Sequence, residues 1–266
     1  MNIFWREIKA FGKFTTTWTI ALSTWITILS LFFPAFYDNA TVITKALESY
    51  PEAVRSLLGL SPDSLTSFLG FYTFVFNGVV ELGIIQAVIL GASVIFKEVS
   101  GKTADFLFTR PATRRQIITS KLGASCISLL ITTIVCFLIS SLMAVFMSQD
   151  TVNFRLLFMV SITLFFIQLL FMIIGTLLAV VFVKMKSAAA LAIGALLINQ
   201  ILFSIFKPIL GEKAVRYIIP IKYFNSEYII KNVSYEVSFI IITFLLIIAG
   251  VILSLIIYEK KDVHAA

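Results

Sequence analysis

Long apolar runs separated by short polar segments dominate the chain. About 20 consecutive apolar residues are enough to cross a bilayer as an α-helix. The runs at 68–96 and 154–183 are long enough to tilt or to contain a break, and the short link at 184–187 joins the fourth and fifth runs as a helical hairpin. Six spans are expected, at residues 17–36, 68–96, 122–147, 154–183, 188–206 and 237–258.

The composition requires lipid as the solvent for most of the chain. Hydrophobic residues make up 59% of its 266 positions and charged residues only 13%, with a mean hydropathy of +1.01. A soluble domain is usually about half apolar and about a quarter charged. We therefore expect an all-α polytopic membrane protein with a single transmembrane domain over 1–266. The first run is too long for a removable signal peptide, and no small-residue cleavage site follows it.

The basic residues predict the orientation of the spans. If both termini are cytoplasmic, thirteen basic residues lie inside and eight outside, which is the bias of the positive-inside rule. All these charges sit in short loops, so we expect membrane lipids and no nucleic acid as partners. Five of the outer basic residues lie in 207–236. That segment is either an outer interaction surface or a sign that the last spans are misplaced.

The first 16 residues have an amphipathic pattern. Phe4, Ile8 and Phe11 fall on one face at helical spacing, and three cations lie largely away from that face. An interfacial helix before the first span fits this pattern, with its apolar face in the acyl boundary and its cations at the head groups. Alternatively, the first span simply begins early.

The charged stretch at 97–121 contains Gly101-Lys102-Thr103, which is how a phosphate-binding loop ends. Such a loop needs a glycine five residues before Gly101, after a buried strand. Phe96 stands at that position, at the end of an apolar helix. Since six spans also leave no room for an ATPase domain, we expect no nucleotide, metal or catalytic site in this chain.

The same stretch predicts a short helix held between the second and third spans. Thr103 can cap it, with Asp105 in its first turn, and Pro111 ends it. Large apolar side chains rimmed by charge usually mark a partner site; alternatively, they tuck under the bundle and the charges are solvated. The residues concerned are Gly101, Thr103, Asp105, Phe106, Leu107, Phe108, Arg110 and Pro111. Thr113 and Gln116 then form a capping-box pattern that opens the next helix.

This stretch resembles the cytoplasmic loop of the type-2 ABC exporter permease family, in its peptide- and antibiotic-exporter branch. Lys102 interrupts the Gly-Thr pair usual there, and Thr113 stands where Ser is common. The amphipathic start and the six-span layout agree with the same family. The residues that match the family's order and spacing are Glu98, Gly101, Thr103, Leu107, Pro111, Arg114 and Lys121.

The resemblance implies that 97–121 is a coupling helix that docks on a separate ABC ATPase subunit. Two permeases, identical or paralogous, and two ATPases would form one transporter in a bacterial plasma membrane. ATP and Mg²⁺ would then bind to the ATPase, so this chain would be a transport subunit and not itself an enzyme. Beside the loop residues above, Glu98, Arg114 and Arg115 would take part in docking.

Glu81 is the most conspicuous polar residue within a predicted span. A charge at mid-bilayer costs at least ~2.5 kcal/mol on insertion scales, so Glu81 is expected to face the bundle interior or to be protonated. With Asn77 and Gln86 on the same helix, it is a candidate for lining a translocation path; a structural hydrogen bond to a neighbouring helix is the alternative.

Small residues recur every four positions on that same helix. Gly83, Ala87 and Gly91 lie on one face, and such spacing lets another helix approach closely. We expect this face to be a packing interface.

Together these features favour the permease subunit of an ATP-driven exporter, forming the path for an amphiphilic substrate such as a peptide or antibiotic. The alternative is an ATP-independent channel or assembly factor whose basic loop binds lipid head groups. The absence of a second intramembrane acid or a His relay disfavours a proton-coupled carrier.

The charge bias makes a testable prediction about topology. In a background without Cys126 and Cys136, a cysteine introduced as Arg114→Cys should react with an impermeant maleimide only after the cells are opened. Lys213→Cys, in the predicted outer segment, is the matched control and should react in intact cells. Labelling of the Arg114→Cys variant from outside would show that the predicted orientation is wrong.

Overall fold

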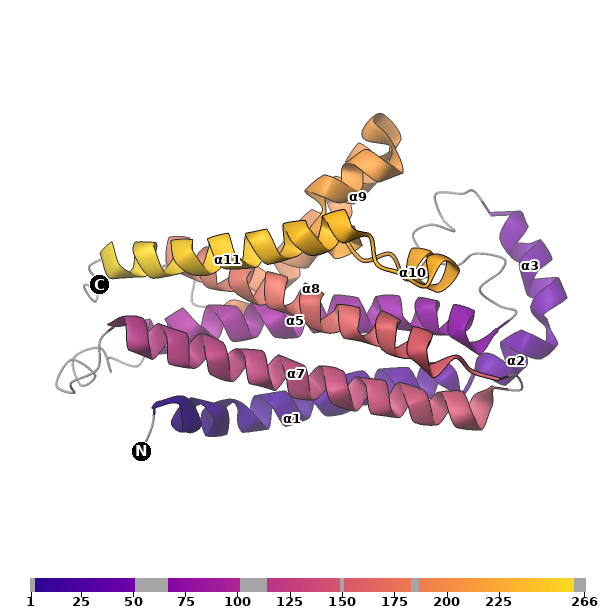
Figure 1. Ribbon diagram of the computed structural model, residues 1–266, viewed down its shortest axis with the longest axis horizontal. Coiled ribbons are helices and arrows are strands. Elements are labelled where there is room, and N and C mark those ends of the chain that lie inside the picture. The colour runs from indigo at the N-terminus through magenta and orange to yellow at the C-terminus, as the bar shows by residue number, and fades with distance from the viewer. Residues whose placement is uncertain (1–2, 51–66, 101–113, 149–150, 183–186, 261–266) are drawn as a thin grey trace.

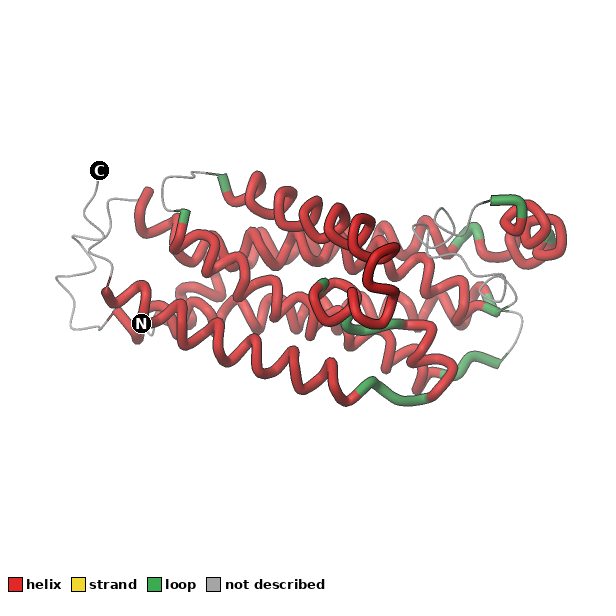
Figure 2. The backbone as a smooth tube through the Cα atoms, turned by 90° about the horizontal axis from the view of Figure 1, so that it is seen from above, coloured by secondary structure: helices red, strands yellow, loops and turns green. Residues whose placement is uncertain are grey.

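The computed structural model is a bundle of helices, and it describes residues 3–50, 67–100, 114–148, 151–182 and 187–260. Within these ranges there is no strand, and six helices are long and apolar enough to cross a membrane (Figure 2). The expected fold class, an all-α polytopic membrane protein with six spans, is therefore confirmed.

Successive long helices run in opposite directions along the long axis of the bundle (Figure 1). The starts of α1 and α7 and the ends of α5, α8 and α11 share one end, here called the near end; α2, α3 and α10 lie toward the opposite, far end. The elements are α1 (Ile3–Ser30), α2 (Phe33–Asp38), α3 (Ala40–Glu48), α5 (Phe68–Ser100), α7 (Arg114–Met147), α8 (Phe154–Val181), α9 (Ala188–Ile218), η2 (Pro220–Lys222), α10 (Ser226–Asn232) and α11 (Val237–Lys260).

The first helix starts earlier than the span expected at 17–36. It is continuous from Ile3 to Ser30, and Glu7 and Phe11 in its first turns are buried. The ring of Phe4 lies against Gly123 at the start of α7. These N-terminal residues therefore pack on another helix, and the interfacial location of the segment stays a prediction.

The helix α5 is the centre of the bundle. It packs against α1, α7, α8 and α9, and its sequence is apolar around most of its circumference, as expected for a helix enclosed by others. Its 33 residues correspond to roughly 50 Å at 1.5 Å per residue. This length exceeds a hydrocarbon core of about 30 Å, so part of α5 extends beyond the core.

Backbone contact between α5 and α8 holds the centre together. A Cβ atom on Gly91 would collide with the carbonyl oxygen of Met172, and one on Gly175 would lie 2.6 Å from the carbonyl oxygen of Val88. Thr176 adds a hydrogen bond from its hydroxyl to the carbonyl oxygen of Gly91, 3.2 Å long. In lipid, close packing and interhelical hydrogen bonds take the place of the hydrophobic effect in holding helices together.

The other small residues of the predicted packing face also meet α8 or lie inside the bundle. A Cβ atom on Gly83 would lie 2.7 Å from Leu164 Cδ1, and Ala87 is fully buried. The structure thus places Gly83 and Gly91 directly against α8.

The helix α9 extends beyond the fifth span expected at 188–206. It continues through Pro208 to Ile218 and is interrupted at Gly211, whose φ of 78° and ψ of 160° are not helical. Only glycine adopts such a backbone conformation without strain. Past this kink the chain turns back toward the bundle, and the far part of α9 projects sideways from it (Figure 1).

The contact between α5 and α8 predicts that Gly91 tolerates no side chain. Gly91→Ala should lower the free energy of unfolding by about 1–3 kcal/mol, because the new methyl group forces two backbones apart. Thermal unfolding followed by fluorescence-detected gel filtration measures this. Gly194→Ala is the control, since nothing lies within 4 Å of a Cβ atom there. Equal midpoints for both variants would contradict the proposed contact.

Candidate functional site

One narrow strip of α5 is less completely covered by the neighbouring helices than the rest. Most of α5 is buried, but residues at helical spacing along one side are partly or fully exposed. Asn77 is exposed and Glu81, one turn further on, is partly buried. We call this side the α5 strip; it consists of Phe74, Asn77, Gly78, Glu81, Leu82, Ile85, Ile89 and Ser93.

Side chains from α1 and α9 lie beside the α5 strip. On the α1 side, the indole of Trp25 covers Gly78 and donates a 3.2 Å hydrogen bond to the carbonyl oxygen of Val75. On the α9 side, Gln200 Nε2 donates a 2.7 Å hydrogen bond to Glu81 Oε1. The strip therefore has an aromatic neighbour from α1 and an amide neighbour from α9.

Contacts of the neighbouring elements show which part of the bundle surrounds Glu81. Phe166 of α8 stacks on Phe224, between η2 and α10, and Leu170 packs with Phe239 in the first turn of α11. Glu81 lies close enough to Lys222 of η2 to interact with it electrostatically. Glu81 thus lies near the middle of the candidate span Phe68–Phe96, as expected, and level with the far end of α11, because α5 is longer than α11.

Lys222 brings a positive charge toward Glu81 from outside the spans. Burial lowers the pKa of its ammonium group; the Glu81 carboxylate acts in the opposite direction, Lys207 lowers the pKa further, and Glu212 raises it. The ammonium lies 4.9 Å from the ring centre of Phe203, within the range of a cation–π interaction. Lys222 is thus partly desolvated and held between an aromatic ring and two acids.

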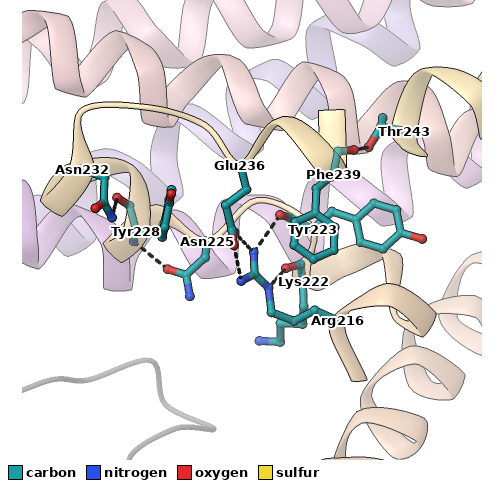
Figure 3. A network of polar contacts seen from close by, with 9 residues as sticks. All are labelled: Arg216, Lys222, Tyr223, Asn225, Tyr228, Asn232, Glu236, Phe239 and Thr243. Atoms are coloured by element: carbon teal, nitrogen blue, oxygen red, sulfur yellow. Dashed lines mark hydrogen bonds and ion pairs between the residues drawn. The ribbon is translucent and has the colours of Figure 1, made fainter. Parts of the chain in front are cut away.

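A buried ion pair fixes the segment that carries Lys222 (Figure 3). Arg216, near the end of α9, binds the carboxylate of Glu236 through both terminal nitrogens. Its other hydrogen bonds go to the carbonyl oxygens of Lys222 (3.0 Å) and Tyr223 (3.1 Å). Its guanidinium also lies 4.4 Å from the ring centre of Phe239. One side chain thereby joins α9, η2 and α11.

Contacts within the protein account for much of the basic charge at 207–236. Arg216 pairs with Glu236, and Lys207 lies 3.5 Å from Glu212. With Lys222 near Glu81, three of the five basic residues have an acidic neighbour. Only Lys213 and Lys231 are fully exposed among the five. The positive charge of this segment is therefore explained without a large basic surface and without misplaced spans.

Gln86 occupies a different environment from Glu81. It is fully buried, and its Nε2 donates a 3.0 Å hydrogen bond to Thr132 of α7. Its Oε1 accepts a 3.0 Å bond from Gln168 of α8, and Thr132 is also bonded to Thr19 of α1. Gln86 is therefore part of a polar network that joins four helices, and it does not lie on the α5 strip with Asn77 and Glu81.

A second buried network crosses the bundle nearer the far end. The hydroxyl of Tyr72 on α5 is 3.0 Å from Ser161 of α8 and accepts a 3.0 Å hydrogen bond from Ser140 of α7. Polar groups in lipid must find partners inside the protein. Both networks satisfy this rule and at the same time tie α5 to its neighbours.

Most of the predicted docking loop lies outside the described residues. This applies to Gly101, Thr103, Asp105, Phe106, Leu107, Phe108, Arg110 and Pro111. Glu98 belongs to the last turn of α5, Arg114 is the first residue of α7, and the Arg115 side chain is exposed. These three residues thus flank the loop at the near end of the bundle.

The sequence reasoning missed Gln200, Lys222 and Arg216. The pair Asn199-Gln200 interrupts an apolar run and was a signal for a polar position on the fifth span. No comparable local signal marked Lys222 or Arg216, because their partners are distant in the sequence. Among the described residues, no group of three His, Cys, Asp or Glu side chains is arranged to hold a metal ion.

The fold and the site define a multi-pass membrane protein with a polar strip on its central helix. A model of the family described as ABC-2 family transporter protein matches residues 1–263. The chain therefore belongs to this family, and it is a transmembrane component of an ABC transporter. Such permeases generally work with an ABC ATPase and often form dimers. No curated protein matches the chain.

The Arg216 network predicts a large effect of a small change. Glu236→Gln should lower the free energy of unfolding by about 3 kcal/mol, because it leaves the buried guanidinium without its counter-charge. Glu212→Gln is the matched control, since its partner Lys207 forms a more exposed pair, and such pairs contribute about 0–1 kcal/mol. Chemical unfolding in detergent compares the two; a larger effect of Glu212→Gln would contradict this account.

Proposed function

We propose that this chain is the permease subunit of an ATP-driven exporter and that the α5 strip lines the path of an amphiphilic substrate. The observation that carries the proposal is the continuity of α5. One unbroken helix runs from Phe68 to Ser100; it carries Asn77 and Glu81 toward the far end and leads at the near end into the predicted docking loop.

This continuity supplies a mechanical link between an ATPase and the path. A helix enclosed by α1, α7, α8 and α9 moves as a rigid element, and small displacements of packed helices are a common form of switching. Because Gly91 and Thr176 bind α5 to α8, motion that begins at 97–121 would shift both helices together. The α5 strip would then move relative to the second permease that we propose to face it.

The path we propose contains Asn77 and Glu81, with Gln200 added from α9. Gln86 is left out, because its donor and acceptor groups are engaged with α7 and α8 inside the bundle. We infer for Gln86 a packing role. A second permease, identical or paralogous, would face the α5 strip and complete the path.

Docking is proposed to occur through the loop between α5 and α7 on the cytoplasmic side. Phe106, Leu107 and Phe108 would provide the apolar anchors, and Glu98, Arg110, Arg114 and Arg115 the polar surround. Anchors of this kind typically contribute about 2 kcal/mol or more each to an interface, whereas charges at the rim act mainly on association rate and salt dependence.

The double variant Phe106→Ala/Leu107→Ala tests this function. It should lose most of the ATPase that copurifies with the wild-type chain from native membranes, and it should lose substrate-stimulated ATP hydrolysis. Leu31→Ala/Phe32→Ala is the matched control: it removes the same two kinds of side chain, both exposed, at the far end of α1, and should keep the ATPase.

The outcome separates the proposed function from its alternative. Wild-type copurification and hydrolysis with the double variant would contradict docking through this loop. If no ATPase accompanies the wild-type chain either, an ATP-independent channel or assembly factor with a lipid-binding basic loop becomes the better description.

A further inference from the structure

Glu81 has few contacts that compensate its charge. Its Oε1 accepts one hydrogen bond, from the neutral amide of Gln200. Among the described residues no Lys or Arg forms an ion pair with it. A partly buried carboxylate is costly unless a cation and further donors compensate it. Within the described residues, the carboxylate of Glu81 therefore has no cation in direct contact with it.

Lys222 acts on Glu81 from a distance and has other partners. Its ammonium lies over Phe203, whose ring also attracts Lys207 at 5.6 Å. Lys207 in turn is paired with Glu212. If another cation takes the place of Lys222 near Glu81, Lys222 keeps its aromatic partner and the nearby acid. Another cation can therefore replace Lys222 beside Glu81 without leaving the ammonium of Lys222 uncompensated.

The apolar part of the α5 strip continues from Glu81 toward the near end. Ile85 and Ile89 follow it at helical spacing and are partly exposed, and Leu197 and Ile201 on α9 expose about half of their surface on either side of Gln200. A head group at Glu81 would therefore lie level with the far end of α11. Its apolar portion would extend deeper along Ile85 and Ile89, which is how an amphiphile orients in a membrane leaflet.

We propose that the α5 strip binds the cationic head group of an amphiphilic substrate, with Glu81 as the counter-ion and Lys222 as the cation that the head group replaces. This inference rests on the proposed function, because it names the substrate class of that path. Because the head group replaces the ammonium of Lys222 near Glu81, its arrival would also weaken the electrostatic interaction between η2 and α5. The backbone of Lys222 would stay bound to Arg216. Substrate binding is thereby connected to the segment between the fifth and sixth spans.

Trp25 offers a native reporter for this binding, because its ring covers Gly78 on the same strip. With Trp5→Phe and Trp18→Phe, it is the only tryptophan in the chain. The full chain in nanodiscs of zwitterionic lipid is titrated with dodecyltrimethylammonium chloride below its micelle concentration. Dodecyl sulfate and dodecyl maltoside serve as anionic and neutral probes with the same tail. Only the cationic probe should produce a saturable change in Trp25 fluorescence.

Two variants give opposite expectations. Glu81→Gln should weaken the apparent affinity for the cationic probe about tenfold or more, the loss expected when a charge-assisted contact becomes a neutral one. Lys222→Met should strengthen it several-fold, because the competing cation is gone. Glu227→Gln, which changes an exposed carboxylate in the first turn of α10, is the control and should change the affinity little; thermal unfolding identifies any variant that fails to fold.

Three results would overturn the proposal. They are an equal response to all three probes, an unchanged affinity in folded Glu81→Gln, or stronger binding of dodecyl sulfate that Lys222→Met abolishes. The assay needs no ATPase. Failure here with normal ATPase docking would therefore reject only the cation site, whereas loss of the docking result would reject the exporter function and leave the binding data intact.

Discussion

The contact between the backbones of α5 and α8 is the constraint on which the rest of the structure depends. Gly91 and Gly175 allow the two helices to touch where any Cβ atom would separate them. In lipid no hydrophobic effect drives helices together, so such close contact, with the hydrogen bond from Thr176, has to supply much of the cohesion. The helices α1, α7 and α9 pack around the joined pair of α5 and α8. They cover the α5 strip only in part.

The buried polar networks then give this packing its specificity. Gln86 and Gln168 each need several partners, and a rotation of α5 or α8 by one residue would remove them. In a low-dielectric interior an unmade hydrogen bond costs about 1–3 kcal/mol, so the networks select one rotational setting of each helix. That setting also points Glu81 outward. The orientation of the candidate site is therefore a consequence of where Gln86 is bonded.

The sequence predicts the number and kind of spans because hydropathy is a local property. It also predicts a packing face at Gly83, Ala87 and Gly91 from their spacing alone. It does not predict that Glu81 is level with the far end of α11, nor the network of Arg216, whose partner Glu236 is twenty residues away. Gln86 and Glu81 are both polar residues on one helix, and the sequence does not distinguish them. Their positions around the helix axis place Gln86 inside the bundle and Glu81 on the α5 strip.

The basic residues in the segment between the fifth and sixth spans are also explained by their contacts within the protein. In the predicted orientation these positive residues run against the usual bias, yet Arg216 and Lys207 are matched by acids from their own segment. Lys222 differs, because its acidic neighbour Glu81 belongs to α5. Lys222 thereby links the segment electrostatically to the central helix. If α5 is displaced as proposed, the distance between these two charges changes, and the segment would respond to the central helix without direct contact with the ATPase.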